Sequence, residues 1–425
     1  MAASTTADNV TAYRPNVKAL LFIFTTTFLG AMGIGLLNPV APFLVSRYVS
    51  DPSQSGLVLG WLTSIYAICQ FIAAPALAVL SDRFGRRGIL LICLLGSAVG
   101  YLVFGIGGAL WVLFAGRIID GITGANFAVT FAYVADITPP QLRGRYFGWI
   151  GATAGIGIIL GPTIGGLLAK FGYTVPLYAA AVITFGNILY GLLFAPESLP
   201  AEKRIEHITI RQLNPLSILF RVFSLRPLRW LLIVIFLYSV PFAVLESNLS
   251  LLAKDTLNWD ADAIGVLFGL VGLTDIVVQG VLLTWLLKRW GEKRVAISGM
   301  GCEVVGYALI ALTVFLNKPA PILIGTIVFA IGDGLLGSSI NGLLSSAAGE
   351  RGQGQGQGGS QAIQALARMV GPILGGLLYS AIGHAVPYLG GAGLVLLTAI
   401  LVNIVVPASR LKIGNAQVRP ESEAA

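Results

Sequence analysis

The residues Pro75 to Leu90 read PALAVLSDRFGRRGIL, and the rest of the fold can be worked out from this stretch. Within it, Ser81 to Arg87 contain one acid and three bases, and an apolar run long enough to cross a bilayer lies on each side. A charged cluster this short between two such runs must lie at a membrane surface. It therefore decides which side of the membrane the neighbouring segments face.

The composition of the chain is that of an integral membrane protein. Of its 425 residues, 56% are hydrophobic and only 11% are charged, whereas about 25% are charged in a soluble domain. The net charge of +8 does not indicate nucleic acid as a partner, because the bases lie in short turns between apolar runs. The expected surrounding is the lipid bilayer.

Metal and cofactor chemistry has no pattern in this sequence. Cys69, Cys93 and Cys302 lie inside apolar runs, and His207 and His384 are isolated. We therefore predict no metal site, no cofactor and no disulfide framework.

Twelve segments reach the roughly 20 apolar residues that a spanning helix needs. They are 18–45, 55–80, 87–107, 110–136, 145–170, 173–194, 229–252, 262–287, 293–316, 319–347, 357–382 and 385–407. The first is long enough to span, so we interpret it as an uncleaved helix rather than a signal peptide. An even number of spans places both termini on one side of the membrane.

The positive charges assign that side to the cytoplasm. The loops and tails on the side of the termini hold 21 of the 27 Lys and Arg residues, and the opposite loops hold Arg47, Lys170, Lys254 and Lys318. Cytoplasmic loops carry an excess of such residues. We therefore predict that both termini are cytoplasmic.

A long connection divides the spans into two sets of six. The predicted organisation is a tail at 1–17, a six-helix bundle at 18–194, a cytoplasmic linker at 195–228, a second six-helix bundle at 229–407 and a tail at 408–425. Within the linker, residues 214–223 have the pattern of a short amphipathic helix at the membrane surface.

The two halves repeat each other. Gly161–Leu168 reads GPTIGGLL and Gly371–Leu378 reads GPILGGLL, while Asp82–Arg87 aligns with Lys288–Lys293 at a similar offset. Duplicated six-helix units are typical of transporters with a substrate site at mid-membrane between the halves. The run GQGQGQGG at 352–359 is interpreted as a turn between the tenth and eleventh helices, and a disordered linker is the alternative.

The chain resembles the major facilitator superfamily, and within it the twelve-helix drug:proton antiporters of the tetracycline-exporter-like group. Three motifs carry the resemblance: the loop signature at Leu80, Asp82, Arg83, Gly85, Arg86 and Arg87, the fourth-helix Arg signature at Arg117, Gly121 and Gly124, and the fifth-helix antiporter signature at Gly148, Gly157, Gly161, Pro162, Gly165 and Gly166. The resemblance implies an all-α fold and a secondary active transporter that exports small amphipathic compounds or drugs in exchange for protons by alternating access. It also implies that Asp136 is the partner of one loop arginine.

The residues give their own reasons for two of these motifs. Asp82 and the adjacent bases can form an ion-paired latch at the cytoplasmic mouth that holds one access state, or they can simply anchor the loop. Gly157, Gly161 and Gly165 recur at every fourth position and give a flat groove for helix packing, which Pro162 would bend. Packing alone is an open alternative to a direct role in transport.

Charged groups inside the membrane cost about 2.5–3.5 kcal/mol each on insertion scales, so they mark candidate functional positions. The candidates for proton coupling are Arg117, Asp120, Asp275, Glu303, Asp333 and Arg368. Our hypothesis is that Asp120 takes the proton and that Arg117, three residues away on the same face, sets its affinity; structural pairing is the alternative. For Arg368 the expected partner is Asp333, ahead of Asp275 or Glu303.

Polar residues of the spans are candidates to line a central substrate cavity, although any of them can instead bond helices together. They are Asn38, Tyr66, Gln70, Asn126, Tyr133, Glu246, Asn248, Gln279, Asn341, Gln361 and Gln364.

The chain departs from tetracycline exporters at two acidic positions. Those proteins carry an acid in helix one, where this chain has Gly30, and another in helix three, near Gly100. Their helix-nine acid falls near Glu303. Proton coupling would therefore use different groups, and tetracycline itself becomes a weaker candidate substrate.

Two other functions were weighed against drug export. One is a carrier of sugars or other small metabolites, as a symporter or uniporter, which the missing acids would suit. The other is a membrane receptor or enzyme, but the sequence contains no nucleophile motif, metal set or nucleotide-binding loop. We therefore predict that the protein is not an enzyme, and a monomer is the default expectation.

Overall fold

The computed structural model describes residues 16–206, 208, 213–214 and 226–405, and these residues form helices with no strand among them. The first half contains α2 (Val17–Leu36), α3 (Ala41–Val45), α4 (Ser55–Phe84), α5 (Arg86–Ile106), α6 (Leu110–Thr123), α7 (Phe127–Ile137), α8 (Pro140–Ala169) and α9 (Val175–Phe194). The second half contains α11 (Arg226–Leu257), α12 (Ala261–Val277), the π-helical η4 (Val278–Leu282), α13 (Leu283–Leu316), α14 (Pro319–Ala381) and α15 (Val386–Val405). Residues 215–223, which carry most of the predicted amphipathic helix, lie outside the described residues, as do 1–15 and 406–425.

The twelve predicted spans are confirmed in the described part of the chain, where eleven helical stretches are long and apolar enough to cross a membrane. One of these stretches, Ala261–Leu316, contains both the eighth and the ninth predicted span. The chain leaves the helical conformation between them at Gly291, whose φ is 75°. Large apolar side chains such as Val182 and Val281 are exposed on these helices, as expected where a helix faces lipid.

The tenth and eleventh spans both belong to α14. A straight helix of its 63 residues would be about 95 Å long. Pro319 at its start and His384 just after its end nevertheless line the same cavity, so the chain reverses direction within α14. The two spans of α14 are Pro319–Ala347 and Gly356–Ala381, and the residues between them, which include 352–355 of the Gly-Gln run, are helical as well.

Two predicted helices are broken. The first, predicted as one helix over 18–45, ends at Leu36 and resumes at Ala41, because Pro39 has no backbone N–H to continue the ladder. The fourth, predicted over 110–136, is interrupted between Thr123 and Phe127. Both breaks place polar side chains, Asn38 and Asn126, at interrupted positions within the membrane, where irregular backbone is usually found next to a cavity.

The internal repeat is visible in the backbone. Gly85 and its repeat partner Gly291 both have positive φ, at 102° and 75°. Gly172 and Gly383, which the repeat also aligns, have φ values of 133° and 149°. A left-handed or similar conformation favours glycine. Each pair of aligned glycines therefore builds equivalent turns in the two halves.

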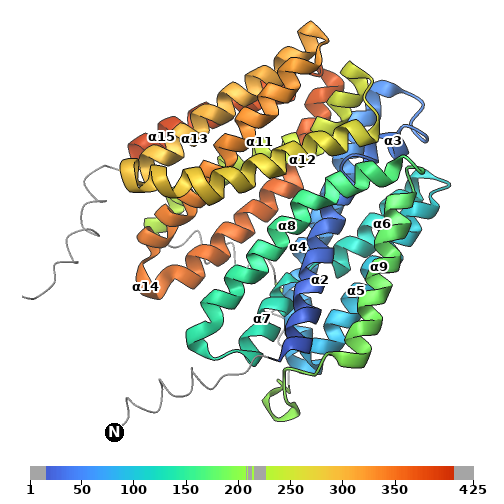
Figure 1. Ribbon diagram of the computed structural model, residues 1–425, viewed down its shortest axis with the longest axis vertical. Helices are drawn as coiled ribbons and strands as arrows, with labels where there is room; N and C mark the ends of the chain where they lie inside the picture. Colours follow the sequence, from blue (N-terminus) through green and yellow to red (C-terminus); the bar gives the residue numbers. More distant parts are fainter. Residues whose placement is uncertain (1–15, 207, 209–212, 215–225, 406–425) are drawn as a thin grey trace, which may run out of the picture.

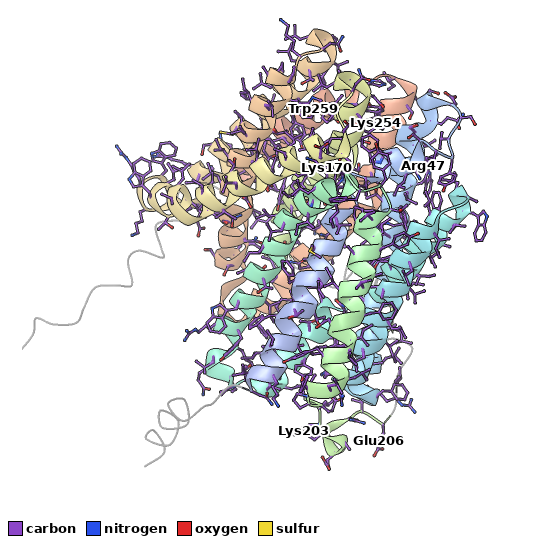
Figure 2. All side chains as sticks on the ribbon, turned by 45° about the vertical axis from the view of Figure 1, so that its right-hand side comes forward. Arg47, Lys170, Lys203, Glu206, Lys254 and Trp259 are labelled. Atoms are coloured by element: carbon purple, nitrogen blue, oxygen red, sulfur yellow. The ribbon has the colours of Figure 1, made fainter. Side chains whose placement is uncertain are left out.

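Labelled residues identify the two ends of the bundle. Arg47, Lys170 and Lys254 lie at one end, and Lys203 lies at the opposite end (Figure 2). Asp82 is at the end of Lys203, since its carbonyl accepts a hydrogen bond from the Ile205 N–H at 3.1 Å. We name these the Lys170 end and the Asp82 end, and the positive charges predict that the Asp82 end faces the cytoplasm.

The two halves lie side by side (Figure 1) and meet along two equivalent seams. In one seam α8 packs on α12, where a Cβ at Gly166 would lie 2.7 Å from the Cα of Gly265. In the other seam α14 packs on α4, with Gly376 against the carbonyl of Gly56. Gly166 and Gly376 are equivalent in the repeat, so the same motif builds both seams.

Polar contacts join the halves at the Lys170 end. The Nζ of Lys170 lies 3.2 Å from Oδ2 of Asp262. The Leu57 N–H donates to the Ser380 hydroxyl at 3.2 Å. With the glycine contacts, these place the described inter-half packing close to the Lys170 end.

Candidate functional site

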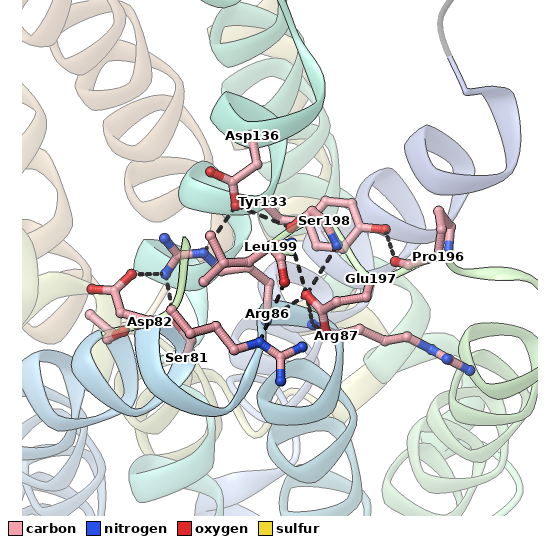
Figure 3. Close-up of polar contacts among 12 residues, drawn as sticks. Ser81, Asp82, Arg86, Arg87, Tyr133, Asp136, Pro196, Glu197, Ser198 and Leu199 are labelled. Carbon is pink, nitrogen blue, oxygen red and sulfur yellow. Dashed lines mark hydrogen bonds and ion pairs between the residues drawn. The ribbon is translucent and has the colours of Figure 1, made fainter. Parts of the chain in front are cut away.

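The predicted gate residues form a compact cluster at the Asp82 end, centred on Arg86 (Figure 3). Arg86 forms ion pairs with Asp82 and, through Nε at 3.2 Å, with Asp136. Its Nη1 also donates to the Ser81 hydroxyl at 2.7 Å. The Arg86 side chain is only 11% exposed, so these pairs are stronger than open-surface ion pairs.

The other two loop bases have different roles. Arg87 donates to the carbonyls of Gly191 and Leu192 at the end of α9, where a cation is favoured by the helix dipole. Arg83 lies over the ring of Phe84 at 5.4 Å. Among the described ion pairs of this loop, Arg86 is therefore the base that joins the two carboxylates, and all three groups belong to the first half.

Glu197, which the sequence presented only as a linker acid, completes the cluster. Its carboxylate accepts hydrogen bonds from the backbone N–H groups of Arg86, Arg87, Ser198 and Leu199. It also faces Gly85, where a Cβ would lie 2.5 Å from Oε2. Glu197 thus caps the start of α5 and fastens the linker to the gate, a role that leaves no spacing signal in the sequence.

Tyr133 does not line a central cavity, so that prediction is wrong. Its ring is fully buried at the Asp82 end, and its hydroxyl donates to the carbonyl of Pro196 at 2.5 Å. The side chain instead holds the beginning of the linker, next to Glu197 (Figure 3).

The fifth-helix glycines pack helices together. A Cβ would lie 2.7 Å from the Phe28 carbonyl oxygen at Gly157 and 2.5 Å from that of Met32 at Gly161. Gly165 likewise faces the carbonyl of Leu36. The predicted groove for α2 is present, with the Pro162 ring against α2 at Gly35.

Two members of this motif differ from the other three. Gly166 faces α12 of the second half rather than α2. Gly148 has no other residue within 4 Å of the position that a Cβ would take. The motif therefore serves two contacts, one inside the first half and one between the halves.

Arg117 and Asp120 form the predicted pair inside the membrane. Nη1 of Arg117 lies 3.7 Å from Oδ2 of Asp120, and the two side chains are 7% and 5% exposed. The guanidinium also lies 4.2 Å from the ring centre of Tyr66, and its Nε donates to the Leu62 carbonyl at 3.4 Å. Arg117 is thus held by three groups, so Asp120 can change its charge while Arg117 keeps its position.

A cavity of about 10 Å³, enough for one water molecule, borders Asp120 within the first half. Its walls include Gly30, Tyr66, Ser97 and Asn126 besides Asp120. Gln70 borders this region too, since it donates to the Tyr66 hydroxyl and the Gly124 carbonyl at 3.3 and 3.1 Å.

The two glycines that stand where the resemblance implies acids both lie at this aspartate. Gly30 lines the same cavity as Asp120. A Cβ at Gly100 would lie 2.8 Å from the Cβ of Asp120. An acid on helix four therefore occupies the region that acids on helices one and three would otherwise share.

Groups from the second half complete the centre of the bundle. Glu246 on α11 interacts with Arg368 and Arg117, and the Asn38 side chain lies within hydrogen-bonding reach of its carboxylate. Tyr66 in turn interacts with both arginines and with Asp120. We call Arg117, Asp120, Glu246 and Arg368 the central charged set.

The structure brings Glu246, rather than Asp333, within electrostatic range of Arg368, and the described ion pairs do not join Arg368 to Asp333 as predicted. The charged groups that act on Asp333 are acids, namely Asp275, Glu246 and Glu303. The reason lies in packing, because Gly371 on α14 lies against the Val240 carbonyl of α11. That contact brings the face of α11 that carries Glu246 toward Arg368.

The other acids of the second half lie together. Glu303 is 2% exposed and interacts with Asp333. Asp275 accepts two hydrogen bonds of 2.8 Å from Gln279, its neighbour four residues on. These acids stay candidates for proton coupling.

The remaining cavity candidates are dispersed. Gln364 donates to the Ser360 hydroxyl at 3.0 Å, while Asn341, Gln361 and Gln279 are exposed. Asn248 is fully buried, and its Nδ2 lies against Gly375. Of the predicted set, the structure brings Asn38, Tyr66, Gln70, Asn126 and Glu246 together near Asp120 and the central arginines, and the exposed residues stay candidates for the cavity wall.

Comparison with known proteins decides the family. The family model described as Major Facilitator Superfamily matches residues 23–368. The chain belongs to the Major Facilitator Superfamily.

The similarity of this facilitator to individual proteins extends over nearly the whole chain. It is 35% identical over 365 residues to the tetracycline resistance protein, class C, of Escherichia coli, covering 86% of this chain and 90% of that protein. It is 28% identical to multidrug resistance protein 2 of Bacillus subtilis (strain 168), covering 84% and 88%. The human organic anion transporter MFSD10 (TETRAN) superposes with a TM-score of 0.67 at 26% identity, covering 92% of this chain and 100% of that one. The protein is thus a multi-pass transporter of the cell membrane.

Proposed function

We propose that this transporter exports small amphipathic compounds, drugs among them, in exchange for protons. The observation that carries the proposal is the buried Arg117–Asp120 pair at the edge of a cavity, in a chain similar to tetracycline and multidrug resistance proteins. That similarity favours export over the carriage of sugars or other metabolites. A single chain supplies both halves, so the proposed transport unit is the monomer.

Asp120 is the proposed proton carrier. In its charged form it is paired with Arg117, so the net charge of the pair is low. In its protonated form it releases Arg117, which Tyr66 and the Leu62 carbonyl continue to hold. The freed cation changes the charge that a substrate meets, and binding of proton and substrate is thereby linked.

Alternating access is supported by where the halves touch. The described contacts between them extend from the Lys170 end to the central charged set, while the Arg86 cluster stays within the first half. Rocking about the central charged set would separate the Lys170 end and bring the Asp82 ends together. The Arg86 cluster would then meet the second half and act as the inner gate.

The test is transport of ethidium by purified protein in liposomes with an imposed pH gradient. For one-to-one exchange, one pH unit corresponds to 1.36 kcal/mol and hence to about tenfold accumulation. We expect Asp120→Asn to abolish this accumulation while retaining exchange of ethidium across the membrane at equal pH. Asp51→Asn, which changes an exposed loop acid, is the matched control and should behave as wild type. Full proton-driven accumulation by Asp120→Asn would refute the assignment.

A further inference from the structure

A second cavity, of about 630 Å³, lies at the Lys170 end of the second half. Its walls come from the end of α11, the loop that follows it, the end of α13, the start of α14 and the segment before α15. Trp259, one of its wall residues, lies at the same end of the bundle as Lys254 (Figure 2). This volume is in the range of small-molecule sites, and the cavity is separate from the central charged set.

The side chains of this cavity fit an organic cation. Asp255 is the one residue with a full charge among those that line it, and Trp259 and His384 add aromatic rings. Asn258 and Asn317 add amide groups. A carboxylate beside aromatic rings is the combination with which proteins bind ammonium groups.

The carboxylate of Asp255 is oriented but not saturated. Its Oδ2 accepts a hydrogen bond from the Tyr379 hydroxyl at 3.0 Å. Its Oδ1 lies 3.6 Å from the Lys254 ammonium, which in turn lies over the Phe43 ring of the first half at 5.8 Å. A carboxylate has about four acceptor positions, so Asp255 can still accept from a ligand.

Tyr379 connects this cavity to the contact between the halves. Its ring stacks on His384 with 4.3 Å between centres, and its hydroxyl is held by Asp255. The same ring faces α4 of the first half, where a Cβ at Gly56 would lie 3.0 Å from Cδ1 of Tyr379. Two residues of the cavity wall therefore position a side chain of the inter-half seam.

We propose that this cavity is a second ligand site, which takes small aromatic cations. Binding there fixes Asp255 and His384, and through Tyr379 it stabilises the arrangement in which the halves meet at the Lys170 end. This site is separate from the substrate site proposed above, and its occupancy is measured without transport.

The binding test uses radiolabelled benzyltrimethylammonium and the full chain in lipid nanodiscs. Loss of the charge partner in Asp255→Asn should weaken binding about tenfold or more, and Trp259→Leu should weaken it by removing an aromatic ring from the wall. Asp260→Asn, an exposed acid of the same loop outside the cavity, should bind within about twofold of wild type, as should Asp120→Asn. Equal binding by Asp255→Asn and Asp260→Asn would overturn the proposal, and so would equally tight binding of benzenesulfonate.

The link through Tyr379 has its own test. Spin labels at Phe171 and Ile382, which are 80% and 67% exposed, report the separation of the halves at the Lys170 end. Benzyltrimethylammonium should increase the short-distance population in wild type. In Tyr379→Phe, which keeps the ring and removes the hydrogen bond to Asp255, binding should persist and the distance effect should be lost. An equal effect in both proteins would refute the link.

Discussion

The contact of Gly166 with the second half allows a sharp test of how the two halves move. A Cβ at this position would lie 2.5 Å from the Ala261 carbonyl oxygen and 2.7 Å from the Cα of Gly265. Both neighbours are backbone atoms, so no side-chain rotation can relieve the clash. Gly166→Ala should therefore push α8 and α12 apart at the Lys170 end.

The size of the effect follows from these distances. Ordinary van der Waals contact begins at 3.4 Å, so the seam must open by about 0.9 Å. Overpacking of this kind costs about 1–3 kcal/mol, which corresponds to a roughly 5- to 150-fold change in an equilibrium constant. Because the strain exists only while the halves touch at this seam, it should shift the population toward the state that is open at the Lys170 end.

The assay is the distance between spin labels at Phe171 and Ile382, measured with the protein in nanodiscs. Gly166→Ala should enlarge the long-distance population. Gly148→Ala, on the same helix but with open space around the glycine, should leave the distances as in wild type. Gly161→Ala, which clashes with Met32 inside the first half, should lower stability without moving the label distances. Identical distance distributions for Gly166→Ala and Gly148→Ala would refute the reasoning.

Three further predictions concern the Asp82 end. Gly85→Ala should lower the free energy of unfolding by roughly 1–3 kcal/mol, measured by thermal unfolding, because φ at Gly85 is 102°. Gly88→Ala, in open helical surroundings, should leave stability unchanged. Equal stability of the two variants would contradict this prediction. Glu197→Gln should speed hydrogen exchange of the capped amides at the start of α5, since hydrogen bonds to a charged group contribute about 1.5–3 kcal/mol, and Glu202→Gln is the control that should leave exchange unchanged. Tyr133→Phe should lower stability by about 0.5–1.5 kcal/mol through the lost hydrogen bond and leave the profile of transported compounds unaltered. A changed profile would show that Tyr133 contacts the substrate.

The spans were predictable because the length of an apolar run reflects the thickness of the bilayer. The breaks at Asn38 and Asn126 were missed because the apolar runs continue on both sides of them. Signals were present in both places: Pro39 follows Asn38 directly, and Gly124 precedes Asn126 by two residues. Weighing proline and glycine within spans, as well as between them, would have located both breaks.

Pairs of site residues were predictable only when they share a helix. Arg117 and Asp120 are three residues apart, so helix geometry alone brings them together. The partner of Arg368 depended on which helix packs against it, and depth in the membrane cannot supply that information. The clue was Gly371 in the repeated motif, because its equivalent, Gly161, packs the fifth helix on the first. By symmetry Gly371 had to pack the eleventh helix on the seventh, which carries Glu246.

The repeat explains why the two halves share seams but not charges. Gly166 and Gly376 sit in copies of one motif, and each closes its own half against the other. The loop copies have diverged, because Asp82–Arg87 contains the cluster around Arg86 while Lys288–Lys293 has a glutamate where Arg86 stands. The central groups have diverged as well, since the first half contains a self-paired Arg117 and Asp120 while Arg368 and Glu246 come from separate helices of the second. Symmetric seams allow the halves to rock about a common axis. Asymmetric charges allow the proton and the substrate to act on different halves of the protein while both drive the same rocking motion.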